Sequence, residues 1–252
     1  MNYNKNKFIS IKGFILNKEQ IQEYMRKLAV EYETKEKSSI TTYPIPRLND
    51  NFKFIEKTYN LLNEHIKKNI NIYSAGEWLL DNFYIIEETV KRIRFSINAK
   101  EYKNFKAIAN GTYKDFARIY VLASEIVACA DNIINEEVLK ISLQAYENER
   151  TLKMEEIWNL PLFLEISIIE NIRKICEKIY INQIQKERVE DIVSRLIEKK
   201  DTFKQSYKLT KEESSIYKNK RYSFIEYMSY KLKRYGKQGT PYLDILEQEV
   251  NK

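Results

Sequence analysis

Hydrophobic residues recur at spacings of three and four along almost the whole chain, which is the period of one face of an α-helix. The clearest example is the segment 74–93. Ser74 and Glu77 have the spacing of a capping box, which predicts that a helix begins there. The positions that follow divide into an apolar face and an acidic and aromatic face. The apolar face holds Leu79, Phe83, Ile86, Val90 and Ile93, and the opposite face holds Glu77, Asp81, Tyr84 and Glu88.

The same pattern and its interruptions predict the other elements. Asn17 is expected to cap the first helix, which ends in the polar run 34–42. Thr151 is a candidate cap for a later helix, and Pro161 suits the first turn of its continuation. Asn110 and Gly111 predict a turn. The further helices are expected at 17–32, 47–66, 100–109, 116–130, 138–146, 154–179, 182–200, 224–235 and 240–250, with breaks at 69–73, 131–132, 199–217 and 236–239.

This pattern, together with the scarcity of helix breakers, predicts an all-α fold. The chain has only 5 glycines and 4 prolines in 252 residues, whereas an α/β protein of this length would use more glycine in its turns. We expect a multi-helix bundle of mostly antiparallel amphipathic helices. Residues 1–43 are interpreted as an N-terminal helical arm and linker, and residues 44–252 as a helical bundle domain. The last helix lacks a glycine or proline stop, which indicates a piece of a longer protein.

The charge of the chain favours an anionic partner only weakly. The 43 Lys and Arg exceed the 36 Asp and Glu by +7, but residues of both signs are interspersed, as on solvated helix faces. The strongest basic patch is 217–237, where tyrosines alternate with lysines and arginines. Such a patch suits nucleic acid or an anionic membrane surface, and it also suits a helix whose lysines simply stay in water.

Cysteine content and hydropathy favour a cytoplasmic location. Cys129 and Cys176 lie in apolar helical stretches, so neither a disulfide framework nor a zinc site is indicated. The most apolar window, 160–169, contains Glu165 and falls far short of the roughly 20 residues of a membrane span. Near the N-terminus, Lys12 and Gly13 interrupt the apolar run, so no signal peptide is predicted.

Candidate catalytic chemistry is sparse. Glu77 and Asp81 lie one helical turn apart and suit acid–base or metal chemistry, but the helix dipole and a basic neighbour explain them better. The single histidine, His65, is expected to be solvated or half-buried in a helix, and no glycine-rich phosphate loop is present. Trp78 and Trp158 suit sugar stacking, but their apolar neighbours favour the core or an interface. We therefore predict no catalytic, cofactor or metal site.

Several motifs in one order carry a resemblance to a known family. The chain resembles the N-terminal region of the cyclic β-1,2-glucan synthases, over about residues 44–181 and again over 222–250. The motifs are YPIPRLNDN, SAGEWLLDNFYIIEE, FARIYVLASEIV, MEEIWNLPLFLEISIIENIRKI and FIEYMSYKLKRYGKQGTPYLDILEQEV.

The resemblance implies a part of a large membrane-associated enzyme that polymerises glucose from UDP-glucose. In that family the chemistry belongs to downstream glycosyltransferase, cyclising and phosphorylase-like domains, so no catalytic residue is carried over to this chain. The resemblance therefore implies a non-catalytic scaffold or docking domain at the inner face of the membrane, whose partners are those downstream domains. The alternative is a free-standing basic helical protein that binds nucleic acid or an anionic membrane through 217–237.

The residues that fall in the matching motifs are expected to fix helix packing. Asp81 is expected to pair with Arg118 or Arg173. The matching residues are Glu77, Trp78, Asp81, Asn82, Glu170, Asn171 and Arg173.

Overall fold

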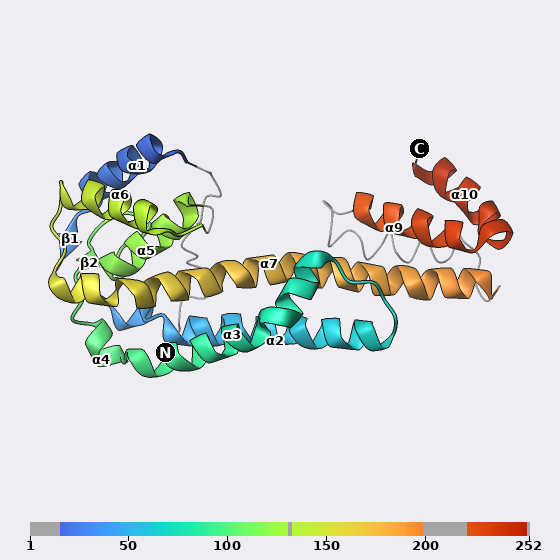
Figure 1. The fold of residues 1–252 in the computed structure, drawn as a ribbon, viewed down its shortest axis with the longest axis horizontal. Helices are drawn as coiled ribbons and strands as arrows, with labels where there is room; N and C mark the ends of the chain where they lie inside the picture. The colour runs from blue at the N-terminus through green and yellow to red at the C-terminus, as the bar shows by residue number, and fades with distance from the viewer. Residues whose placement is uncertain (1–15, 131–132, 199–220, 251–252) are drawn as a thin grey trace. The chain divides into compact units, whose positions relative to one another are not determined.

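The computed structural model describes residues 16–130, 133–198 and 221–250, and these residues are almost entirely helical (Figure 1). The one sheet in these ranges is an antiparallel pair of two-residue strands. The predicted all-α class is confirmed. The elements are α1 (Lys18–Glu31), β1 (Thr34–Lys35), η1 (Ile40–Thr42), α2 (Ile45–Lys67), α3 (Ser74–Ser96), α4 (Ala99–Tyr102), β2 (Ala107–Ile108), α5 (Arg118–Cys129), α6 (Glu136–Glu147), α7 (Met154–Ile197), α9 (Arg221–Arg234), η3 (Gly236–Gln238) and α10 (Thr240–Val250).

The chain divides into two compact units, each built from two stretches of sequence. Unit 1 comprises Met1–Ile55 and Asn82–Lys174, and unit 2 comprises Glu56–Asp81 and Ile175–Lys252. The helices α2, α3 and α7 each contribute residues to both units.

Unit 1 is organised around α5, every residue of which is buried. A helix that is apolar on all sides lies in the interior of a protein, and α5 is such a helix except for a few polar side chains. The hydrophobic pattern predicts one inward face for this segment, whereas the structure buries all of its faces. Tyr120 of α5 stacks on Phe163 of α7 with ring centroids 5.6 Å apart, and Phe105 meets the same ring edge-on at 5.5 Å. This aromatic cluster forms the centre of unit 1.

The N-terminal elements pack against the rest of unit 1. Helix α1 lies against α6, and β1 pairs with β2. Asn17 caps α1 through a complete capping box with Gln20, as the sequence predicts for that cap. The turn predicted at Asn110 and Gly111 is present, with Gly111 at φ +65°. The division into an arm ending at residue 43 and a bundle domain stays a prediction.

Unit 2 has its own hydrophobic core between the C-terminal part of α7 and the helices α9 and α10 (Figure 1). The predicted stop after α9 is confirmed, since Gly236 adopts φ +52° and α10 begins at Thr240. The buried core residues are Val189, Ile192, Val193, Leu196, Met228, Leu232 and Leu246.

The helix α7 differs from the prediction. The sequence predicts two helices, 154–179 and 182–200, whereas the structure has one continuous helix of 44 residues. Asn182 lies inside it, because the buried positions continue past this residue at Gln183, Lys186 and Val189. Pro161 also lies inside the helix, not at its first position. Lys153, not Thr151, precedes the helix, and its backbone N–H donates to the Glu156 carboxylate at 2.8 Å.

Some predicted features lie outside the described residues. These are the first fifteen residues, the break at 131–132 and the irregular stretch 199–217. Within the ranges that the structure describes, no helix combines the length and the hydropathy needed to cross a bilayer.

Candidate functional site

The connection between α2 and α3 in unit 2 has a defined conformation that ends one helix and begins the next. Asn69 adopts φ 55°, the left-handed conformation that ends many helices. The N–H of Asn69 donates to the carbonyl of Ile66 at 3.0 Å, and the N–H of Ile70 donates to the carbonyl of His65 at 2.9 Å. These two bonds form a Schellman motif, which satisfies carbonyl groups at the end of α2.

The helix α3 begins at Ser74, as predicted, but Ser74 lies inside its first turn and not before it. The N–H groups of Gly76 and Glu77 both donate to the carbonyl of Tyr73, at 2.7 and 3.1 Å. The side chain of Leu62 lies 3.1 Å from where a Cβ on Gly76 would stand, so a glycine permits the close approach of α3 to α2.

A buried lysine from α7 holds this connection in place. Lys186 is 5% exposed, and its Nζ donates to the Asn71 carbonyl at 2.9 Å. The same ammonium lies 3.3 Å from the centre of the Tyr73 ring, a cation–π contact. Burial lowers the pKa of Lys186 to about 8. The buried ammonium of Lys186 therefore holds the connection between α2 and α3 from the side of α7.

His65 is fully buried, so the expectation of a solvated or half-buried histidine is wrong. Its Nδ1 lies 3.2 Å from Nε2 of Gln183, and its Nε2 lies 3.6 Å from the Glu187 carboxylate. Desolvation by burial lowers the pKa of His65, although the carboxylate of Glu187 acts in the opposite direction. The side chains that contact the imidazole are Gln183 and Glu187, and neither is a nucleophile of the serine or cysteine kind.

An open groove with a volume of about 850 Å³ lies on the outer side of the connection. Its wall combines the end of α2, the connecting residues and the first two turns of α3. Two carboxylates, two carboxamide residues and several aliphatic side chains line it. The lining residues are Ile66, Asn69, Ile70, Asn71, Ile72, Glu77, Leu80 and Asp81.

The two faces predicted for α3 are confirmed. Leu79 and Ile86 are buried, whereas Glu77, Asp81 and Glu88 are exposed. The carboxylates of Glu77 and Asp81 thus point away from the core, on the side of the helix that lines the groove.

The predicted ion pair between Asp81 and Arg118 is wrong. That arginine is buried in unit 1, where its Nε donates to Glu156 at 2.9 Å and a second nitrogen donates to the Thr151 carbonyl at 3.2 Å. The guanidinium of Arg173 lies over the ring of Phe54 at 4.8 Å. Among the described residues, Asp81 makes no ion pair.

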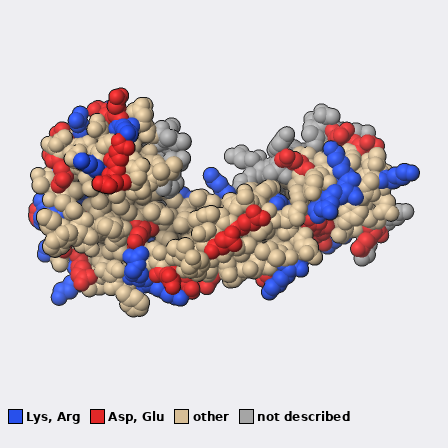
Figure 2. All heavy atoms as spheres, viewed as in Figure 1, with Lys and Arg blue, Asp and Glu red and all other residues tan. Residues whose placement is uncertain are grey.

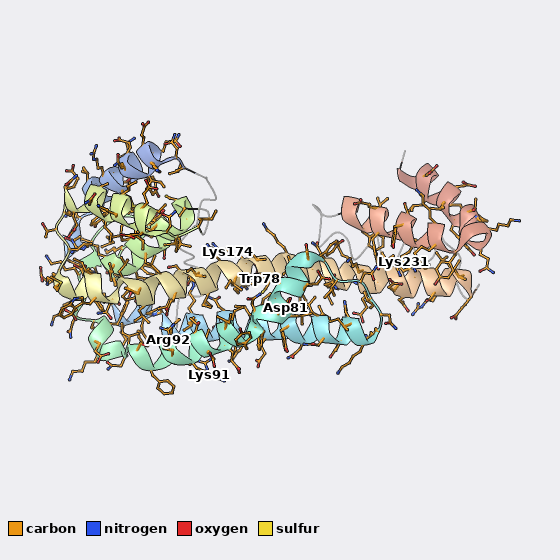
Figure 3. The ribbon with its side chains drawn as sticks, viewed as in Figure 1. Trp78, Asp81, Lys91, Arg92, Lys174 and Lys231 are labelled. Atoms are coloured by element: carbon orange, nitrogen blue, oxygen red, sulfur yellow. The ribbon has the colours of Figure 1, made fainter. Side chains whose placement is uncertain are left out.

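Both tryptophans are on the surface, so a core position is wrong for them, whereas an interface stays a prediction. Trp78 is 51% exposed and Trp158 is 75% exposed. Figure 3 shows Trp78 and Asp81 projecting from the start of α3. They are three residues apart, which makes them neighbours on the helix surface. Trp78 belongs to unit 2 with Asp81, while Trp158 belongs to unit 1.

The remaining motif residues have packing positions in unit 1. Glu170 is buried, accepts a hydrogen bond from the Tyr120 hydroxyl at 2.7 Å and pairs with Arg47 at 2.8 Å. Burial raises the pKa of Glu170, against the opposing effect of Arg47. Asn171 is buried beside it, and Asn82 is partly buried.

The basic patch predicted at 217–237 is described only in part, since 217–220 lie outside the described residues. Basic side chains gather over α9 on the face drawn in Figure 2. Lys231, however, pairs with Glu190 of α7 at 2.6 Å, and the guanidinium of Arg234 lies 6.0 Å from the Tyr230 ring centre. At least one charge of the patch thus holds α9 to α7.

Over the described ranges, no three His, Cys, Asp or Glu side chains come together in a group that could hold a metal. Cys129 and Cys176 are free and buried. The helical pattern pointed to Glu77, Trp78 and Asp81 but gave no signal for the roles of Asn71 and Lys186. Asn69 follows a long amphipathic helix directly, and this position was the sequence signal for its left-handed cap. Lys186 is more than 100 residues away in the sequence, so no local pattern links it to the connection.

The chain was compared with protein-family models and with known proteins. No family model matches the chain. The chain is similar to the cyclic beta-(1,2)-glucan synthase NdvB of Rhizobium meliloti (strain 1021), with 26% identity over 156 residues. The aligned part is 62% of this chain and 5% of that protein, so the chain spans only a small fraction of its relative's length. The similarity supports a distant relationship to a glucan synthase.

Proposed function

We propose that the chain is a non-catalytic helical module, a scaffold or docking element, of a glycosyltransferase that makes cyclic β-1,2-glucan. The observation that carries the proposal is the similarity to the rhizobial synthase over 156 residues, 62% of the chain. The partners of the module are downstream glycosyltransferase and membrane domains of the same polypeptide or complex. It acts at the cytoplasmic face of the membrane, as the resemblance implies, and its two free thiols suit a reducing compartment.

The buried charges of unit 1 support a scaffold role, because they join helices to one another. Arg118 of α5 pairs with Glu156 of α7, and both side chains are almost fully buried. Glu170 of α7 is held by Arg47 of α2 and by Tyr120 of α5. The Glu170 carboxylate thus joins α7 to both α2 and α5, and loss of either partner would leave a costly unpaired polar group in the interior.

A domain exchange tests the proposal. The region of the rhizobial synthase that aligns with this chain is deleted, and cyclic β-1,2-glucan made from UDP-glucose by isolated membranes is measured. We expect the deletion to abolish the product and this chain, inserted in its place, to restore a measurable part. A matched insert carrying Phe163→Asp should restore none, because it places a charge at a fully buried position of unit 1.

Two results would contradict the proposal. One is undiminished glucan synthesis after the deletion, with the enzyme present in the membrane at its normal amount. The other is an inserted chain that is folded, as shown by resistance to proteolysis, and restores no product.

A further inference from the structure

The segment that joins α9 to α10 in unit 2 concentrates cations and exposed tyrosines. We propose that this segment, residues 230–237, docks on an anionic membrane surface by binding lipid headgroups. We call it the basic turn. The membrane as partner rests on the proposed function, whereas the charge and the aromatic character rest on the basic turn itself (Figure 2).

Three cations of the basic turn face solvent. Lys233, Arg234 and Lys237 are exposed, and in the described part of the chain none of them pairs with a carboxylate. Lys231 differs from them, because it pairs with Glu190 of α7 at 2.6 Å and its side chain is only 13% exposed. One cation thus holds α9 against α7, and the other three remain available to an anionic partner.

The basic turn lies in a long stretch without acidic residues. No Asp or Glu occurs from residue 227 to residue 243, although the whole chain has 36 in 252 residues. The dipole of α9 favours cations in its last turn, but Lys237 lies beyond the end of that helix. The stretch is therefore a local excess of positive charge, which the net charge of +7 for the whole chain does not by itself require. Such an excess attracts the negative surface of a bilayer that contains anionic lipids.

The tyrosines suit a bilayer interface better than a nucleic acid. Tyr230 is 48% exposed and Tyr235 is 42% exposed, and tyrosine is enriched where a membrane meets water. Stacking on a nucleic acid base requires a free ring face. The ring of Tyr230 stacks on Tyr227 at 6.1 Å and meets the guanidinium of Arg234 at 6.0 Å. These two residues precede and follow Tyr230 by about one helical turn, so they cover its ring from both directions along the helix.

The frame of the basic turn is fixed by the core of unit 2. Leu232 is fully buried in that core, and its carbonyl accepts a hydrogen bond from the N–H of Tyr235 at 3.1 Å. Gly236 adopts φ +52°, and the N–H of Gly239 donates to its carbonyl at 3.0 Å. A surface whose backbone is already held in position loses less freedom on binding.

Sedimentation with lipid vesicles tests the inference. The whole chain is mixed with vesicles of phosphatidylcholine that contain about 30% phosphatidylserine, or with vesicles of phosphatidylcholine alone. We expect binding only to the anionic vesicles, and we expect it to weaken steeply as salt is added. The triple variant Lys233→Gln, Arg234→Gln and Lys237→Gln should lower the partition coefficient on the order of a hundredfold, because each basic side chain near an anionic surface contributes about fivefold.

A second triple variant is the matched control. Lys103→Gln, Lys114→Gln and Lys140→Gln remove the same charge from three exposed lysines of unit 1, and should change the partition coefficient little. Circular dichroism checks that both triple variants are folded. If the first one is not, the single variant Lys237→Gln, which changes a residue outside the helices α9 and α10, should still lower the coefficient about fivefold.

Three results would overturn the inference. The first is no binding of the unmodified chain to the anionic vesicles at low salt. The second is an equal loss in the two triple variants, since binding would then depend on the charge of the whole chain. The third is tighter binding to single-stranded RNA than to the vesicles, lost in the first triple variant, since the basic turn would then be a nucleic-acid site.

The two proposals fail separately. If the basic turn binds no anionic vesicle but the inserted chain restores glucan synthesis, only the membrane site is wrong. If the basic turn binds anionic vesicles but the domain exchange fails, the scaffold role is wrong and the membrane site stands.

Discussion

Individual buried polar side chains, more than surface charges, determine how the helices of each unit meet. In unit 1, Glu125 of α5 accepts hydrogen bonds from the hydroxyls of Tyr24 and Tyr113, although it is almost fully buried. In unit 2, the buried Lys186 of α7 donates to the Asn71 carbonyl at 2.9 Å. Each of these contacts requires one particular residue type at one position, because an unpaired polar group in the interior is costly.

The buried histidine makes the stability of unit 2 depend on pH. Burial lowers the pKa of His65 below its ordinary value of 6.5, so the unfolded chain binds the proton more tightly than the folded one. Stability is therefore full above pH 6.5 and falls as the pH decreases from 6.5 towards the lowered pKa. The slope reaches at most about 1.4 kcal/mol per pH unit for one proton. Urea unfolding between pH 5 and pH 8 measures it, followed by circular dichroism.

The variant His65→Gln is the control for this prediction. It should flatten the dependence between pH 5 and pH 6.5, whatever its effect on stability at pH 8. The hydrogen bond from Lys68 lowers the pKa of Glu187. Its contribution to stability is lost only below pH 4.5, the ordinary carboxyl value, and so in a different pH range from that of His65. An unchanged slope in the variant would rule out His65 as the source.

At this scale the sequence predicts which face of a helix is buried better than it predicts single side chains. Leu79 and Ile86 lie inside as their spacing indicates. Trp78 lies outside although its neighbours are apolar, because adjacent positions of a helix point about 100° apart. His65 lies inside because Gln183 and Glu187 face it from α7, and this packing between distant segments leaves no local signal.

Among the elements, the turn between α9 and α10 depends most on a single residue. A Cβ added to Gly239 would lie 2.0 Å from the backbone carbonyl oxygen of Leu232. Backbone cannot rotate away as a side chain can, so α10 would have to shift from α9. Leu246, which α10 contributes to the core of unit 2, would then lose its packing.

We expect Gly239→Ala to lower the free energy of unfolding by about 1–3 kcal/mol, the range for overpacked sites. Gly236→Asn is the matched control. Gly236 has open space around its Cα and φ +52°, a conformation that asparagine tolerates, so this change should cost little. Urea unfolding of both variants gives the comparison. A larger loss at Gly236 than at Gly239 would contradict the structure of this turn.

Some helix ends could be predicted from the sequence and others could not. Asn182 resembles a helix cap, and a cap there would separate two helices of ordinary length. The structure continues the helix because Gln183, Lys186 and Val189 find buried partners in unit 2. Conversely, the stop at Gly236 and the restart at Thr240 follow from local backbone preferences, and they were predictable.

For the whole molecule, the placement of α5 predicts where exchange with solvent is slowest. All twelve of its residues are buried, whereas α10 has several exposed positions. Backbone amides exchange only when their hydrogen bonds open, and a helix surrounded by other elements opens only with its entire unit. We expect peptides covering α5 to exchange most slowly in hydrogen–deuterium exchange mass spectrometry, and peptides covering α10 to exchange earlier. Equal exchange in the two helices would contradict the central position of α5.

The division into two units was not predictable from the hydrophobic pattern. Each unit takes an early and a late part of the chain, and no change of composition marks residues 55, 81 or 174. What separates the units is which distant segments pack together, and a pattern of period 3.6 carries no information on that. The helical class itself was predictable, because it depends on period and on the scarcity of glycine and proline.

The order of these segments has a consequence for synthesis on the ribosome. Glu56–Asp81 emerges early, but the rest of unit 2 begins only at Ile175. Until residues from Ile175 on are translated, the early segment lacks the other part of its own unit. Its apolar side chains that are buried in the folded protein include Leu62 and Leu79. Exposed apolar surface on a nascent chain is the kind that chaperones bind. The demand of this protein on the folding machinery is thus set by the order in which its segments are translated.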